Sequence, residues 1–147
     1  MATSPPIPIL TISLAQHLHG HSIRKTLKEQ WSKTRVPAST SSRFANIGFD
    51  LDAQGTNLSE LESRLRERQW GGIIVGWCSR GNIEFTELFE AVVGVCVDYS
   101  VETKKGDISQ TEPKLIFCRG PDDLVNATLR LQSQSPHYSR LEPVRLP

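Results

Sequence analysis

The sequence lacks the features that mark several large classes of protein. No apolar run approaches the roughly 18 residues that a membrane-spanning helix needs. The opening residues contain three prolines and no basic segment, so we expect no secretory signal peptide. Basic and acidic side chains number 17 and 16, which leaves a net charge of +1 without a basic face. The sequence therefore predicts neither a nucleic-acid partner nor a membrane partner.

Cysteine is also scarce. Cys78, Cys96 and Cys118 are odd in number and lack the spacing of a disulfide framework, so we expect reduced thiols and a cytoplasmic protein. Cys78 follows a predicted strand at a helix start, where a lowered thiol pKa would favour a nucleophile; the alternative is a small buried apolar side chain. Gly76 and Gly81 are not followed by the Lys-Ser/Thr of a phosphate-binding loop. We predict no cofactor.

Four apolar runs, each followed by a segment with helical periodicity, divide the chain. We predict strands over residues 7–14, 44–51, 72–77 and 114–118, and helices over 23–34, from 57 onward, over 84–99 and over 122–131. Asn57 is expected to cap the second helix, with Glu60 completing a capping box. Residues 100–112 are predicted to form a surface loop, and residues 132–147 an irregular tail.

This alternation of strands and helices predicts the architecture. Right-handed crossovers between successive strands give one α/β domain, residues 1–147, with a four-stranded parallel sheet and helices on both faces. The simplest strand order is 2-1-3-4, a short version of the flavodoxin-like winding.

Most of the unusual polar residues follow predicted strands. In open parallel sheets, ligands bind beyond the carboxyl ends of the strands, where the winding reverses. The residues expected there are His17, His19 and His21 after the first strand, Asp50 and Asp52 after the second, Trp77, Cys78, Ser79 and Arg80 after the third, and Arg119, Asp122 and Asp123 after the fourth. The sequence therefore predicts a small-molecule site at this edge.

Arg80 is the main candidate for binding a ligand. A guanidinium beside a helix start can hold a carboxylate or phosphate through paired hydrogen bonds. Its neighbours after the third strand, with Arg119 and Asp122, would complete the binding surface. The alternative is that Arg80 forms a salt bridge to Asp50, Asp122 or Asp123 and only ties loops together.

The candidates for catalysis are one of the three histidines together with Asp50 or Asp123. An unperturbed imidazole titrates near neutrality, which suits a proton donor or acceptor. Such a group would support cofactor-independent isomerisation, cyclisation or elimination. The alternatives for His17, His19 and His21 are a metal site and, more simply, ordinary loop or helix-capping roles.

The stretch "NIGFDLDAQGT" raises a third possibility. Asp50 and Asp52 after an apolar run resemble the nucleophile motif of haloacid-dehalogenase-type phosphatases, which would imply a magnesium-dependent phosphatase. The motif of that family is similar to Asp-x-Asp-Gly-Thr, whereas Ala53 and Gln54 here precede Gly55. A regular helix also follows at once, where that family has a flap.

The C-terminal half, from "GGIIVGWCSRGNIEFTELFEAVVGV" through "KLIFCRGPDDLVNATLRL", resembles a group of short, largely uncharacterised α/β proteins from bacteria and fungi. The matching residues are Gly76, Arg80, Leu88, Phe89, Glu90, Phe117, Pro121 and Asp123. The resemblance implies the fold and the loop positions, and it implies no activity.

The sequence thus favours a protein that binds a small anionic or polar organic molecule, with or without acid–base catalysis. Two further classes of function compete with this interpretation. One is the phosphatase. The other is a non-catalytic binding or assembly module, because the helix over 84–99 carries an apolar face wider than one sheet contact requires. That face predicts a possible homodimer.

Overall fold

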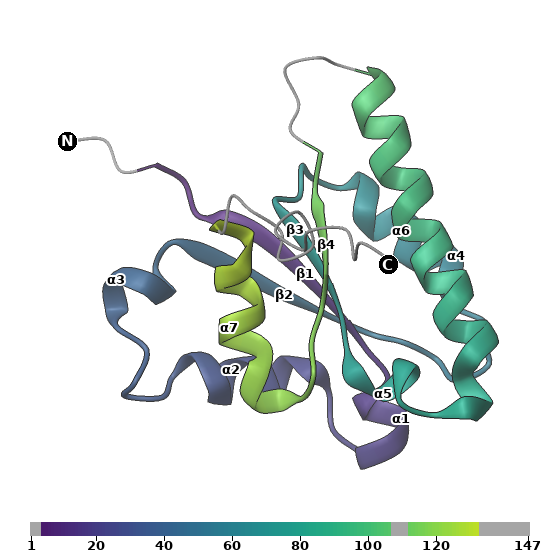
Figure 1. Ribbon diagram of the computed structural model, residues 1–147, viewed down its shortest axis with the longest axis horizontal. Helices are drawn as coiled ribbons and strands as arrows, with labels where there is room; N and C mark the ends of the chain where they lie inside the picture. Colours follow the sequence, from purple (N-terminus) through teal and green to yellow (C-terminus); the bar gives the residue numbers. More distant parts are fainter. Residues whose placement is uncertain (1–3, 107–111, 133–147) are drawn as a thin grey trace, which may run out of the picture.

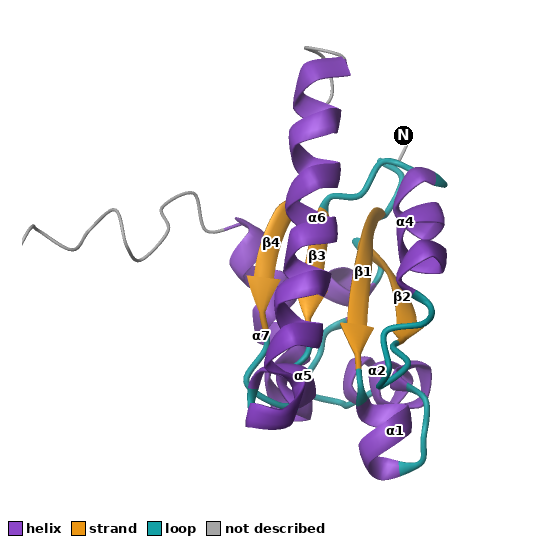
Figure 2. Cartoon of the chain, turned by 90° about the vertical axis from the view of Figure 1, so that its right-hand side faces the viewer, coloured by secondary structure: helices purple, strands orange, loops and turns teal. Residues whose placement is uncertain are grey.

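A computed structural model of the chain describes residues 4–106 and 112–132. Its strands are β1 (Ile7–Ser13), β2 (Phe44–Asp50), β3 (Gly72–Val75) and β4 (Lys114–Phe117). They form one parallel sheet in the order β2-β1-β3-β4, in which all four arrows point the same way (Figure 2). The predicted α/β domain, sheet and strand order are confirmed.

Two layers of helices cover the sheet (Figure 1). One layer contains α2 (Ile23–Trp31) and α7 (Leu124–Leu129), and the other contains α4 (Leu58–Arg66) and α6 (Thr86–Gly106). Because successive strand residues point to opposite faces, Leu10 packs under α4 and α6, whereas Ile9 packs under α2 and α7. Both are fully buried, as expected for a parallel sheet covered on both faces.

The periodicity of α2 explains its place in the fold. Ile23 and Leu27, four residues apart, are both buried against the sheet. The Ser22 hydroxyl accepts a hydrogen bond from the Arg24 N–H at 3.2 Å and so caps the first turn. The helix ends at Trp31 rather than at residue 34.

Three short helices, α1 (Ala15–His19), α3 (Ala38–Ser41) and α5 (Trp77–Arg80), replace predicted loops, and α5 also takes Trp77 from the end of the predicted third strand. A short helix, η1 (Ile83–Phe85), precedes α6, and the predicted helix over 122–131 divides into η2 (Pro121–Asp123), α7 and η3 (Arg130–Gln132). The Ser13 hydroxyl accepts a hydrogen bond from the Ala15 N–H at 3.1 Å, which starts α1 directly at the end of β1. Helices of one turn bury little surface of their own, so they leave no periodic pattern in the sequence.

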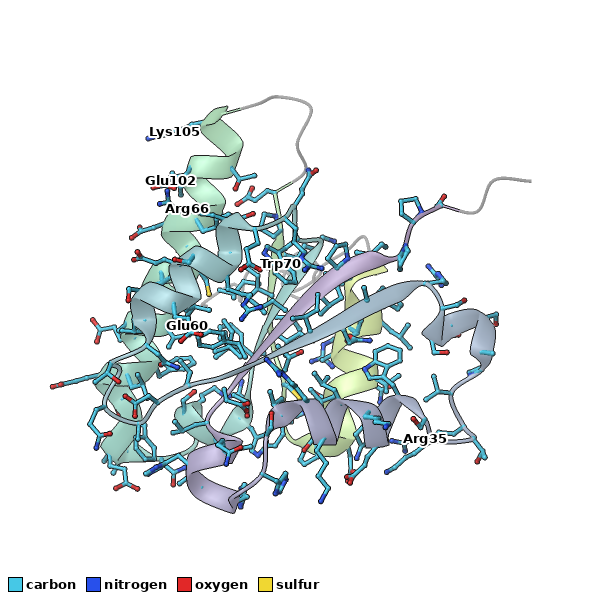
Figure 3. The ribbon with its side chains drawn as sticks, turned by 180° about the vertical axis from the view of Figure 1, so that it is seen from behind. Arg35, Glu60, Arg66, Trp70, Glu102 and Lys105 are labelled. Carbon is cyan, nitrogen blue, oxygen red and sulfur yellow. The ribbon has the colours of Figure 1, made fainter. Side chains whose placement is uncertain are left out.

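The helix after β3 is longer than predicted. We expected a helix over 84–99 and a surface loop over 100–112, but α6 continues to Gly106. The hydroxyls of Ser100 and Thr103 donate to the carbonyl oxygens four residues earlier, at 3.0 and 2.9 Å, so these polar side chains lie within the helix. Arg66 of α4 forms a 3.3 Å ion pair with Glu102 (Figure 3). The loop prediction was therefore wrong for residues 100–106, and residues 107–111 and the tail at 133–147 lie outside the described residues.

Asn57 precedes α4 but does not cap it through its side chain. Its amide nitrogen donates to the Asp50 carbonyl oxygen at 3.0 Å, and its amide oxygen accepts from the Asp52 N–H at 3.0 Å. The side chain therefore ties the end of β2 to the loop that follows, and the predicted capping box was wrong. Within residues 4–106 and 112–132, every helix is too short or too polar to span a lipid bilayer.

Candidate functional site

The carboxyl ends of β1 and β3 lie against each other. The Gly76 N–H donates to the Ile12 carbonyl oxygen at 2.7 Å. A Cβ on Gly76 would lie 3.0 Å from that oxygen and 3.4 Å from the Ser13 side chain, so a larger residue would push the two strand ends apart by a few tenths of an ångström. The short helices α1 and α5 begin two residues beyond the last residues of β1 and β3. The predicted site residues lie in separate clusters around the strand ends.

The first cluster contains His17. Its ring packs edge-to-face against Phe85, with 5.9 Å between the ring centroids, and it lies close enough to Asp52 to interact with that carboxylate electrostatically. The rings of His19 and His21 stack on each other at 6.2 Å, and all three histidines are exposed. Among the described residues, no group of three or more His, Cys, Asp or Glu side chains is placed to hold a metal ion.

The Asp50 carboxylate holds the start of α2. One oxygen accepts the Ser22 hydroxyl at 2.5 Å, and the other accepts the Ile23 N–H at 2.8 Å. These bonds join β2 to a segment 27 and 28 residues earlier in the chain. Because both oxygens are already engaged, the geometry favours a structural role for Asp50 over a role as nucleophile or base.

Asp52 closes the loop after β2. It accepts hydrogen bonds from the Thr56 hydroxyl, from the Thr56 N–H at 3.1 Å and from the Gln54 N–H at 3.4 Å. The side-chain bond from Thr56 is the largest cause that lowers the pKa of Asp52, so it remains a carboxylate near neutral pH. The two aspartates therefore point to different partners, which gives the phosphatase interpretation no geometric support.

Arg80 lies at the end of α5 and reaches toward β4. Its guanidinium donates to the Cys118 carbonyl oxygen at 3.3 Å and lies 5.8 Å from the centroid of the Phe117 ring. The side chain is exposed, and it forms no ion pair with a carboxylate of the described residues. The alternative salt bridges from Arg80 to Asp50, Asp122 or Asp123 are therefore not formed among the described residues.

Asp123 has the most complete set of partners. Its two oxygens accept a fork of hydrogen bonds from Arg130, both at 3.1 Å, and the Arg119 N–H donates at 3.0 Å. Burial raises the pKa of Asp123, but the bonds from Arg130 and Arg119 outweigh it and hold the pKa below its ordinary value. Asp123 is thus the buried member of a partly exposed ion pair, and sequence reasoning missed its partner Arg130.

The remaining predicted binding residues divide between interior and surface. Cys78 and Ser79 are buried, and Trp77 is half-buried against both apolar layers. Asp122 is exposed, and the Arg119 side chain is 83% exposed, with its Nε 4.0 Å from Asp123. Of this group, Arg119 and Asp122 are accessible to a ligand.

All three cysteines are free and buried. Burial raises the pKa of all three thiols. The pKa of Cys96 rises to about 12 and that of Cys118 to about 11. Neutral buried thiols behave as small apolar side chains. The structure therefore favours the apolar interpretation of Cys78 over the nucleophile.

A groove of about 280 Å³ lies at the carboxyl edge, between the loop after β2 and the start of α6. Its lining includes Gln54, Gly55, Glu84 and Glu87. Neither Arg80 nor a histidine lines it. A larger groove, of about 560 Å³, lies elsewhere, along β4 and the second half of α6.

Comparison with family models, with curated proteins and with solved structures finds no match to this chain. The resemblance of the C-terminal half to short bacterial and fungal α/β proteins stays a prediction.

Proposed function

We propose that this protein binds a small organic anion, a carboxylate or a phosphate, at the carboxyl edge of the sheet, with Arg80 as the anchor. The observation that carries the proposal is the state of the Arg80 guanidinium. It is exposed, held in place, and without a carboxylate partner among the described residues.

The contacts of Arg80 leave most of its hydrogen-bonding capacity free. One terminal nitrogen donates to Cys118, and the Phe117 ring supports the planar group from beneath. Arginine has five N–H donors in a fixed fork that matches carboxylate and phosphate oxygens, so the others can hold an anion. The aromatic support reduces the rotamer freedom that binding would otherwise have to remove.

Arg119 supplies a second positive charge at the same strand end. It follows Cys118, the residue whose carbonyl oxygen Arg80 contacts, and its side chain extends into solvent. Two guanidinium groups at one strand end favour a ligand with more than one anionic oxygen.

Binding without a chemical step is what the geometry favours. Asp50 and Asp123, the carboxylates expected to work with a histidine, are each held by structural hydrogen bonds. His17 follows β1 and lies beside Phe85 and Asp52, whereas Arg80 contacts the residue after β4. The histidine and the arginine are therefore in different clusters. For its location we propose the cytoplasm, a reducing compartment in which the three free cysteines would stay reduced.

The test is binding of inorganic phosphate and of a panel of small dicarboxylates and tricarboxylates, by isothermal titration calorimetry and thermal shift. Arg80→Ala should weaken binding by about tenfold or more, because a charge-assisted pair of hydrogen bonds is lost. Arg119→Ala should weaken it less, because that side chain is less constrained.

Arg43→Ala is the matched control. Arg43 is also an exposed arginine over an aromatic ring, 5.6 Å from the centroid of Phe44, but it precedes β2 at the opposite edge of the sheet. Its loss should leave binding unchanged. Equal anion affinity in wild type and Arg80→Ala would refute the proposal, and so would unfolding of Arg80→Ala, which would make Arg80 a structural residue.

A further inference from the structure

β4 lies at one edge of the sheet, with β3 on one side and no strand on the other among the described residues. The Lys114 N–H donates to the carbonyl oxygen of Gly71, just before β3, and the Cys118 N–H donates to that of Val75 in β3, both at 3.3 Å. In a parallel pair, alternate residues of a strand point their N–H and C=O groups to the same neighbour. Leu115 and Phe117 therefore point theirs away from β3, toward the free edge.

The free edge has a specific set of open and closed groups. The Phe117 carbonyl oxygen already accepts a hydrogen bond from Arg130 at 2.8 Å. Pro113, two residues before Leu115, also faces the free edge, and it has a carbonyl oxygen but no N–H. The N–H and C=O of Leu115, the N–H of Phe117 and the C=O of Pro113 have no hydrogen-bond partner within residues 4–106 and 112–132.

Beside this edge runs the groove of about 560 Å³. One wall is β4 from Lys114 to Ile116, and the other is α6 at Val97, Ser100 and Val101. Figure 2 shows α6 passing β4 and continuing beyond the start of the strand. Val97 and Val101 of that wall are 45% and 44% exposed, among the most exposed large apolar side chains of the described residues. Open backbone groups and exposed valines therefore share one surface.

We propose that this surface binds a second copy of the same chain, through antiparallel pairing of β4 with its counterpart about a two-fold axis at Leu115. The two Leu115 residues would exchange both of their N–H···O=C bonds. Each Phe117 N–H would donate to the C=O of the partner's Pro113. The sheet would then run continuously through both copies, with Val97 and Val101 packing against the partner's α6.

The pattern of closed groups supports a second copy over another occupant. In this register, Pro113 lies opposite the partner's Phe117, where an ordinary residue would also donate an N–H to the Phe117 oxygen. Proline has no N–H to donate, and Arg130 already satisfies that oxygen. The missing donor of one strand thus matches the occupied acceptor of the other. A parallel pairing would not place these two residues opposite each other, and an antiparallel strand of another sequence would produce the match only with proline at this position.

The competing explanation is that Pro113, Lys114 and Arg130 protect the edge from pairing, as proline and charged residues do at many sheet edges. That explanation predicts a monomer at every concentration. It leaves the N–H and C=O of Leu115, at the centre of the edge, and the two exposed valines without a role.

The experiment measures association of the full 147-residue chain by sedimentation velocity over a wide concentration range. The wild type should show a reversible dimer. Val97→Glu and Val101→Glu should each raise the dimer dissociation constant by roughly tenfold or more, because each places a carboxylate in the interface with the partner's α6. Ile83→Glu is the matched control, since Ile83 is 94% exposed and lies outside the groove, and it should leave the dissociation constant unchanged.

Hydrogen exchange tests the strand pairing itself. In the dimer, the amide protons of Leu115 and Phe117 should exchange slowly, and in Val101→Glu they should exchange rapidly while the rest of β4 stays protected. A wild type that remains monomeric overturns the proposal. A dimer in which the Leu115 amide stays unprotected also overturns it, because the subunits would then associate without β4. Circular dichroism and thermal melting of each variant distinguish lost association from lost folding.

Discussion

Removing the Asp123 carboxylate should destabilise the fold while leaving anion binding at Arg80 intact in the folded protein. Asp123→Ala deletes the fork of hydrogen bonds from Arg130, both at 3.1 Å, and the acceptor of the Arg119 N–H at 3.0 Å. Arg130 would keep only its bond to the Phe117 carbonyl oxygen, at 2.8 Å. The ion pair joins the start of α7 to η3 at its other end, and the bonds of Arg130 to Phe117 and of Arg119 to Asp123 connect the pair to the end of β4.

The magnitude follows from burial. Removing one partner of a fully buried ion pair costs about 3–5 kcal/mol, because the other charge stays buried without compensation. The side chain of Asp123 is 10% exposed, but that of Arg130 is 35% exposed, so water can solvate part of the guanidinium. We therefore expect a loss of about 2–3 kcal/mol. For a chain of this size that corresponds to a fall in melting temperature of about 5–10 °C.

Urea denaturation followed by circular dichroism measures this loss. Arg130→Ala and the double variant complete a mutant cycle. The sum of the stability losses in the two single variants should exceed the loss in the double variant by about 1.5–3 kcal/mol. The pH dependence gives a second measurement. Because the pKa of Asp123 is lower in the folded than in the unfolded state, its contribution is complete above the unfolded pKa and is lost as the pH falls through the folded pKa.

The stability gap between wild type and Asp123→Ala should therefore be full near neutral pH and should close in acid, below about pH 4. A loss smaller than about 0.5 kcal/mol, within the range of ordinary surface substitutions, would refute the reasoning. A gap that persists unchanged in strong acid would show that packing, and not the ion pair, causes the loss.

Two further predictions follow from the same contacts. Asp50→Ala should cost about 1–2 kcal/mol in urea denaturation, because it removes the acceptor of the Ser22 hydroxyl and the Ile23 N–H at the start of α2. Asp50→Asn, which keeps one acceptor oxygen, should cost less, and unchanged stability in both would contradict the structural role. The three buried thiols should react with a thiol reagent on the order of a hundredfold more slowly in the native than in the urea-unfolded protein, because their raised pKa values reduce the thiolate fraction. Rapid native labelling of Cys78 alone would restore it as a candidate nucleophile.

The sequence predicted the sheet because apolar runs and helical periods are local signals. Ile23 and Leu27 lie one helical turn apart, and both proved to be buried. The same reasoning placed the end of the third helix too early, since Ser100 and Thr103 read as polar loop residues. Their hydroxyls instead bond to the preceding turn of α6.

The sequence also placed the polar residues of the site at one edge, but not their partners. Asp50 with Ser22, Asp123 with Arg130, and Arg80 with Cys118 are pairs separated by 28, 7 and 38 residues. Arg130 could have been suggested by its position two helical turns after Asp123, where long side chains reach the same face. No pattern indicates that Asp50 caps α2.

The sequence by itself determined the strand order and the edge at which polar residues gather, because both follow from the succession of elements along the chain. Only the tertiary structure decided which carboxylates are occupied, which guanidinium is free, and which backbone groups of β4 face outward. These properties depend on contacts of a few ångströms between segments distant in the chain. A local pattern of residue types carries no information about such distances.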